Sequence, residues 1–195
     1  MIYMKFTPFE EVMGGERGFA LLVKVAPIPE EGEEGRWEIP PEAFKSGADE
    51  VHPLPVKGNA VLSGRIYKDD KTVFFNGAVT ATLDLSCSRC LKQFEMDIKE
   101  DVTAVFMPRA VMSSVVDEVE VTQEDLDVQL YDEEELDLFG PAHDQVALAL
   151  PMRPLCDESC KGLCPRCGND LNEGLCGCSE PVGDSRFAAL KKLKF

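Results

Sequence analysis

The sequence lacks the long apolar run that a membrane-spanning helix requires. No stretch of its 195 residues approaches the roughly 18 consecutive apolar residues of such a helix. The start, MIYMKFTPFEE, has no apolar core of a secretory signal and soon turns acidic. These absences predict a cytoplasmic protein with no membrane partner. The balance of 44% hydrophobic and 29% charged residues is typical of a globular chain.

Histidine is scarce, and the common catalytic motifs are missing. The two histidines are His52, which precedes Pro53, and His143, which precedes Asp144. The sequence contains no GxSxG, P-loop, GxGxxG or HExxH pattern. We therefore predict no catalytic residues and no small-molecule substrate. A hydrolase is the least favoured alternative.

Basic residues are absent from residues 110–152, although that segment holds twelve of the acidic residues. The whole chain has a formal net charge of −16. Such a charge argues against generic phosphate binding, which depends on Lys and Arg. One interpretation is a solvated acidic segment. The functional interpretation is a docking surface for a basic protein, with Glu133, Glu134 and Glu135 as candidate contacts.

Alternating apolar and polar residues dominate the region 58–107. This period-two pattern predicts a three-stranded antiparallel meander with residues 87–90 at the tip of its second hairpin. The strands are long, so we expect bends or bulges near Gly77 and Glu100. Shorter elements are predicted around this meander: a strand in 19–25, a loop over 27–35, a strand and helical turn in 37–44, another such pair in 116–131, a helix over 139–150 and a short helix near 185–193.

These elements predict an α+β fold with an antiparallel sheet core, a few short helices and a Cys-rich zinc-binding C-terminal region. The expected domain organisation has two parts. Residues 1–150 form a mainly antiparallel β domain that includes the acidic segment 110–150. Residues 151–195 form a zinc-ribbon-like region packed on it.

Cysteine is the residue in clear excess, with eight copies in separate groups. In a cytosolic chain this clustering indicates metal ligands more than disulfides. The last four, Cys164, Cys167, Cys176 and Cys178, resemble a zinc ribbon, in which Zn²⁺ takes four thiolates in a tetrahedron. Gly168 lets the chain turn with a positive φ, and Gly177 allows the tight final bend. Disulfides and reduced core thiols are the alternatives.

The other four cysteines complete a second set of ligands: Cys87, Cys90, Cys156 and Cys160. The first pair has knuckle spacing, and the second pair can present two sulfurs on one helical turn. A redox-active CxxC pair is the alternative, but such a motif opens a helix after a strand, whereas this pair lies between two strands. Four protein ligands leave no open position for water, so both predicted zinc sites are structural.

The cysteine region and the end of the chain resemble the YceD family. The resemblance rests on the CSRCL string at 87–91, on ALALPMRPLCDESCKGLCPRCGNDLNEGLCGC at 147–178 and on the closing DSRFAALKKLKF, and it covers roughly residues 50–195. The family's C-x-R-C motif falls on Cys87 and Cys90. The second cysteine set of its longer members falls on the last four cysteines. The resemblance implies a role in accumulation of large-subunit ribosomal RNA.

We therefore expect a non-enzymatic factor in large ribosomal subunit biogenesis that holds two zinc ions. Its partner is a basic ribosomal protein of the large subunit, ribosomal RNA or a pre-ribosomal particle. Basic residues beside the cysteines offset thiolate charge or, in the rival interpretation, join the C-terminal tail in contacting RNA. These residues are Arg89, Lys92, Lys161, Arg166, Lys191, Lys192 and Lys194. A zinc- or redox-responsive regulatory protein is the alternative from a different class.

Overall fold

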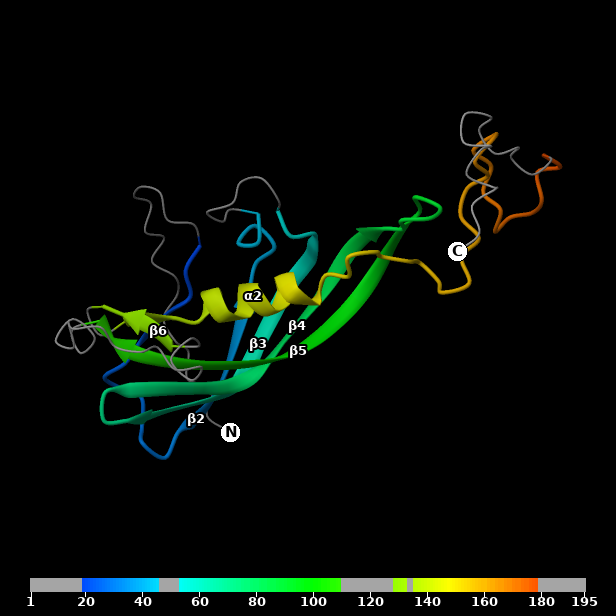
Figure 1. Ribbon diagram of the computed structural model, residues 1–195. Helices are drawn as coiled ribbons and strands as arrows, with labels where there is room; N and C mark the ends of the chain where they lie inside the picture. Colours follow the sequence, from blue (N-terminus) through cyan, green and yellow to red (C-terminus); the bar gives the residue numbers. More distant parts are fainter. Residues whose placement is uncertain (1–18, 46–52, 110–127, 133–134, 179–195) are drawn as a thin grey trace, which may run out of the picture. The chain divides into compact units, whose positions relative to one another are not determined.

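The computed structural model describes residues 19–45, 53–109, 128–132 and 135–178. Its elements, shown in Figure 1, are β1 (Leu22–Lys24), β2 (Glu33–Ile39), β3 (Val56–Asp69), β4 (Thr72–Ser86), β5 (Gln93–Pro108), β6 (Val128–Tyr131), β7 (Glu135–Asp137) and α2 (Phe139–Ala149). Five strands form one sheet in the order β2-β3-β4-β5-β6, and β1 pairs with β7 in a two-stranded sheet. The fold is α+β with a sheet core, as predicted.

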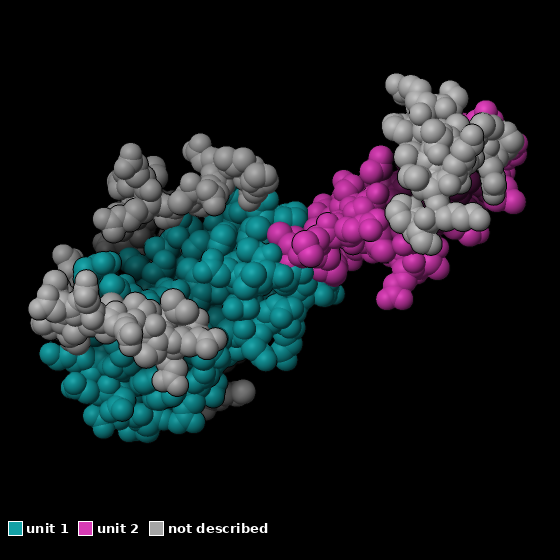
Figure 2. Space-filling model, viewed as in Figure 1, with its two compact units in different colours: residues 1–82, 97–149 teal, residues 83–96, 150–195 magenta. Residues whose placement is uncertain are grey.

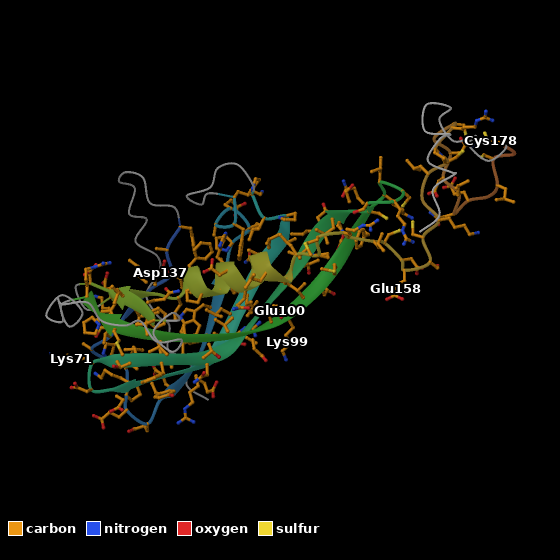
Figure 3. All side chains as sticks on the ribbon, viewed as in Figure 1. Lys71, Lys99, Glu100, Asp137, Glu158 and Cys178 are labelled. Atoms are coloured by element: carbon orange, nitrogen blue, oxygen red, sulfur yellow. The ribbon has the colours of Figure 1, made fainter. Side chains whose placement is uncertain are left out.

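The predicted meander is confirmed as β3, β4 and β5, which are neighbours in the sheet. Every second residue of β4 from Val73 to Leu85 is buried, except at Gly77. The same alternation runs along β5 from Ile98 to Phe106. It places the half-buried Glu100 on the apolar face and the exposed Lys99 on the other, and both are labelled in Figure 3. Alternation therefore continues through both positions where bends were expected.

Gly77 takes part in a close approach with a glycine of the neighbouring strand β3. Gly35 of β2 is paired with Gly64 of β3. An added Cβ at Gly64 would lie 2.4 Å from the Cα of Gly77 and 2.5 Å from the carbonyl oxygen of Asn76. An added Cβ at Gly35 would meet the ring of Trp37, which lies edge-on to Phe75 at a centroid distance of 5.9 Å. The three glycines let backbone and aromatic rings approach closely on the buried face.

The sheet differs from expectation at both of its edges. The loop predicted over 27–35 is wrong at its end, because β2 begins at Glu33 and pairs antiparallel with β3 along its full length. Hydrogen bonding with β3 stabilises a strand here, although the Pro, Glu and Gly residues of that stretch have low strand propensity. At the other edge, β6 pairs with β5 in parallel, with Val105 opposite Val128. Only the end of the strand and helical turn predicted over 116–131 lies within the described residues.

Helix α2 agrees with the helix predicted over 139–150 to within one residue. Asp137 holds its start: one carboxylate oxygen accepts hydrogen bonds from the backbone N–H of Leu21 at 2.7 Å and of Phe139 at 2.9 Å. The ring of Phe139 then packs against Phe19 and Phe44 at centroid distances of 4.9 and 5.5 Å. Among the described residues, no helix has the length and apolar character needed to cross a membrane.

The chain divides into two compact units, coloured separately in Figure 2. The first unit comprises residues 1–82 and 97–149, and the second comprises 83–96 and 150–195. The second unit thus combines the tip of the β4–β5 hairpin with the Cys-rich segment. The organisation into a 1–150 domain and a 151–195 region stays a prediction. The helix predicted near 185–193 lies outside the described residues.

Candidate metal centres

All eight cysteines lie in the second unit and form two groups of four. The hairpin cluster consists of Cys87, Cys90, Cys156 and Cys160, and the ribbon cluster consists of Cys164, Cys167, Cys176 and Cys178. Within each cluster the four sulfur atoms lie within 4.8 Å of one another. These are the two sets that the spacing predicted. Both clusters can hold a metal ion.

The sulfur separations in the hairpin cluster fit a tetrahedral metal site. The Sγ atoms of Cys87 and Cys160 are 3.8 Å apart, and those of Cys90 and Cys156 are 3.7 Å apart. A disulfide bond is about 2.05 Å long, so these sulfurs belong to separate thiols. Four sulfurs at about 2.3 Å from a central zinc would be separated by roughly 3.8 Å. These two of the six sulfur separations therefore match the edge length expected for a zinc–thiolate tetrahedron, and the other four are at most 4.8 Å.

The hairpin cluster is also the small core of the second unit. Cys87, Cys90 and Cys160 are buried together, and Phe94, Leu155, Cys156 and Leu163 pack against them. Two of the ligands come from the β4–β5 turn and two from a segment about 70 residues later in the chain. A bound ion would therefore connect distant parts of the sequence.

Arg89, in the turn between Cys87 and Cys90, forms hydrogen bonds with the segment that contains Cys160. Its guanidinium Nη1 donates to the carbonyl oxygens of Cys160 at 2.7 Å and Glu158 at 3.1 Å. Its own carbonyl oxygen accepts from the N–H of Leu163 at 3.1 Å. Arg89 thus fastens the turn to the segment that supplies the second pair of cysteines. These contacts support a positioning role beside the thiolates.

The two CxxC turns have the same local backbone structure. In the hairpin cluster, the N–H of Leu91 donates to the carbonyl of Cys87 at 2.9 Å. In the ribbon cluster, the N–H of Gly168 donates to the carbonyl of Cys164 at 2.9 Å. Leu91 has φ 62° and Gly168 has φ 75°. The positive φ predicted at Gly168 is confirmed, and Gly177, at the predicted tight bend, also has a positive φ of 67°.

The ribbon cluster is more open to solvent than the hairpin cluster. Cys164 is buried and Cys176 half-buried, whereas Cys167 and Cys178 are exposed, the last of which is labelled in Figure 3. The N–H of Cys164 donates to the carbonyl of Asn169 at 2.8 Å, and Leu163 forms an antiparallel bridge with Asp170. The chain therefore folds back on itself between the two ligand pairs.

Hydrogen bonds and burial give the thiols of each cluster different pKa values. Backbone N–H groups of Cys156 and Cys90 lower the pKa of Cys87 to about 6, and those of Cys167 and Arg166 lower the pKa of Cys164 to about 6. Burial raises the pKa of Cys156 to about 12, and contact with the Cys167 and Cys176 thiols raises the pKa of Cys178 to about 12. Without a cation, Cys156 and Cys178 therefore stay protonated, and four thiolates this close would require a bound cation such as a divalent metal ion.

The structure places only some of the other predicted residues. Glu135 lies in β7, half-buried and paired with Lys24. Arg166 is exposed in the CxxC turn of the ribbon cluster. His143 stacks on Phe44 at a centroid distance of 6.2 Å, with its Nδ1 3.5 Å from a carboxylate oxygen of Asp144. Glu133, Glu134, His52 and the tail lysines Lys191, Lys192 and Lys194 lie outside the described residues.

Asn172 makes a contact with a candidate metal ligand that the sequence analysis did not predict. It belongs to the loop between the two ligand pairs of the ribbon cluster, yet its Nδ2 donates to the Sγ of Cys160, in the hairpin cluster, at 3.4 Å. Asn172 is the second of two asparagines in the string NDLNEG and has no distinctive spacing to a cysteine, so nothing in the sequence marked it. Its contact depends on how the loop folds back.

Comparison with known proteins gives one family match. The sequence model of the family described as "Large ribosomal RNA subunit accumulation protein YceD" matches residues 75–194, which is more than half of the chain. Uncharacterized proteins of Mycobacterium bovis and Mycobacterium tuberculosis are each 36% identical over 110 residues, which is 56% of this chain and 50% of theirs. The chain thus spans about half the length of these curated relatives.

A plant protein is also similar over a shorter stretch. The "Large ribosomal RNA subunit accumulation protein YCED homolog 1, chloroplastic" of Arabidopsis thaliana is 33% identical over 60 residues, which is 31% of this chain and 19% of that protein. No solved structure matches the chain significantly. The match of the family model covers both cysteine clusters and the hairpin that holds the first.

Proposed function

We propose that this chain, which belongs to the YceD family, is a non-enzymatic cytoplasmic factor in the biogenesis of the large ribosomal subunit. The single observation that carries this proposal is the family match over residues 75–194. The name of the Arabidopsis relative supports the same process.

Depletion of the protein in its host tests the assembly role. We expect a shortage of large subunits on a sucrose gradient, with the tagged protein on their precursors or with free ribosomal protein. A normal gradient, with the protein only in the lightest fractions, would contradict the proposal.

The second part of the proposal is that each cluster holds one structural zinc ion. The sulfur spacing of 3.7–3.8 Å in the hairpin cluster and the four convergent sulfurs of each cluster support it. When bound, zinc would supply positive charge that offsets the thiolates and would connect the hairpin turn to the Cys-rich segment. Native mass spectrometry should show two zinc ions per chain. Intact thiols with no metal would contradict this part.

The partner that we favour is a basic ribosomal protein, and the support is the net charge of −16 together with the acid-only segment 110–152. The triple variant Glu133→Gln/Glu134→Gln/Glu135→Gln should bind such a protein more weakly and with a smaller dependence on salt. The matched control Glu30→Gln/Glu31→Gln/Glu34→Gln removes the same charge elsewhere. If both variants bind the basic ribosomal protein as tightly as the parent chain does, the proposal of a basic protein partner is contradicted.

Direct RNA binding is the rival within the same process. The Arg89 guanidinium already donates to two backbone carbonyls, which favours its structural role over an RNA contact. The remaining basic residues near the clusters are Lys92, Lys161 and Arg166. A filter-binding assay with ribosomal RNA separates the two partners, because RNA binding should weaken when these three are changed to Gln, whereas protein binding should not.

A zinc- or redox-responsive role is the second candidate function, and the exposure of Cys167 and Cys178 favours it. Mild peroxide should then release metal from the ribbon cluster before the buried hairpin cluster. Retention of both ions under peroxide would argue against this role.

A further inference from the structure

The two clusters share one short strip of backbone, residues 160–164. Cys160 belongs to the hairpin cluster and Cys164 to the ribbon cluster, with three residues between them. On one side the strip bonds to Arg89, through the N–H of Leu163 and the carbonyl of Cys160. On the other side it bonds to the ribbon loop, because the N–H of Leu171 donates to the carbonyl of Gly162 at 2.9 Å.

Asn172 carries this contact from the ribbon loop to a sulfur of the hairpin cluster. Its Oδ1 accepts from the N–H of Lys161 at 2.8 Å, and its Nδ2 donates to the Sγ of Cys160 at 3.4 Å. The carboxylate of Asp170 orients it by accepting from both its backbone N–H and its Nδ2. The side chain is therefore held with its donor directed at a predicted ligand of the other cluster.

We propose that Asn172 is a positioning residue that couples the two metal centres, so that an ion in the ribbon cluster strengthens metal binding by the hairpin cluster. This inference rests on the proposed metal binding of both clusters. An ion bound by the ribbon cluster holds the loop of residues 168–175 closed between its ligand pairs. The closed loop presents the Nδ2 of Asn172 to the Cys160 thiolate.

An N–H donor stabilises a thiolate without competing for the metal. Partners outside the ligand set commonly change metal affinity by about 10- to 100-fold, and we expect an effect within this range. Because coupling between two binding sites is reciprocal, the hairpin cluster should strengthen the ribbon cluster by the same factor. The loading of the two ions is then cooperative.

The test uses the full chain and Co²⁺, whose thiolate complexes absorb light, with Zn²⁺ competition to obtain the two stepwise affinities. The variant Asn172→Asp keeps an oxygen acceptor for the Lys161 N–H but replaces the donor with a carboxylate oxygen. We expect it to weaken binding by the hairpin cluster about tenfold or more. The control Asn169→Asp adds the same charge to the same loop, where only the backbone carbonyl of residue 169 bonds to the cluster. It should leave both affinities unchanged.

A second background shows whether the effect is coupling. Cys167→Ser/Cys178→Ser disables the ribbon cluster at its two exposed cysteines. In that background the hairpin cluster should already bind weakly, and Asn172→Asp should weaken it no further. The coupling is contradicted if Asn172→Asp still lowers the metal affinity of the hairpin cluster by the full factor in this background. It is also contradicted if neither Asn172→Asp nor Cys167→Ser/Cys178→Ser lowers that affinity. In both cases the binding of two ions still stands. If the parent chain binds no metal at all, the proposed metal centres themselves fail.

Discussion

Leu91 has a left-handed backbone conformation that its counterpart, Gly168, adopts without steric cost. Leu91 has φ 62° and its side chain is 65% exposed, so the strain is not offset by burial. Leu91→Gly should raise the free energy of unfolding by about 0.5–1 kcal/mol. Gly168→Leu, at a site where an added Cβ meets no atom within 4 Å, should lower it by about 1 kcal/mol. Denaturant unfolding of the zinc-loaded protein measures both changes. A loss of stability in Leu91→Gly would mean that the leucine side chain stabilises the turn.

The same residue scale shows what sequence can and cannot reveal about the site. The grouping of the eight cysteines into two sets of four and the turns at Gly168 and Gly177 follow from spacing, because CxxC pairs and glycines have local geometric meaning. Leu91 was not identified because a leucine in a left-handed conformation leaves no signature. Arg89 and Asn172 were not assigned their contacts because their partners lie 71 and 12 residues away along the chain. Such contacts exist only after the fold brings the segments together.

At the scale of elements, α2 begins next to the half-buried carboxylate of Asp137, whose titration should affect stability. Burial raises the pKa of Asp137 above the usual 3.8. The folded state therefore binds a proton on Asp137 more tightly than the unfolded chain does. This difference in proton binding stabilises the fold fully below pH 3.8, and the stabilisation is lost as the pH rises through the pKa of the folded state. Asp137→Asn keeps an oxygen acceptor for Leu21 and Phe139 but does not titrate. The variant should gain stability relative to the parent between about pH 4 and pH 7, measured by denaturant unfolding. A constant difference across that range would contradict the raised pKa.

The row of glycines across β2, β3 and β4 gives a second prediction for elements. Gly64→Ala would place a methyl group 2.4 Å from the Gly77 Cα, and backbone at this point cannot move without disturbing the strand pairing. We expect a loss of about 2–3 kcal/mol in the free energy of unfolding. The control Gly140→Ala lies in α2, where the nearest atom is 3.6 Å from the added Cβ, and should gain up to about 1 kcal/mol. Similar losses in both variants would show that close approach is not the cause.

The elements that were predicted well are those with a local pattern. Strands β3, β4 and β5 alternate apolar and polar residues over many positions, and α2 ends before Pro151. Strand β2 was partly missed because Gly35 and the surrounding glutamates have low strand propensity. The strand forms because it pairs with β3, a contact that the local sequence does not reveal. The parallel direction of β6 was also missed, because a four-residue strand carries no information about the direction of its partner.

At the scale of the whole molecule, the two units depend on different sources of stability. The first unit buries large apolar side chains such as Phe75, Phe106 and Leu62 in its core. The second unit contains a small cluster of buried residues that consists of three cysteines, Cys87, Cys90 and Cys160. Removing metal should therefore loosen the second unit and leave the first largely intact, because only the second needs its thiolate charges offset.

Hydrogen exchange read by mass spectrometry measures this difference in one experiment on the full chain. After chelation we expect faster exchange in residues 83–96 and 150–178, where the N–H of Ser88 bonds to Pro154 and that of Leu163 bonds to Arg89. Peptides from β3 and from residues 97–108 of β5 should keep their protection. Added Zn²⁺ should restore protection in residues 83–96 and 150–178. Loss of protection in both units would show that the sheet itself depends on the ions. No change in either unit would show that the clusters contribute nothing to stability, and the structural role of the metal would have to be abandoned.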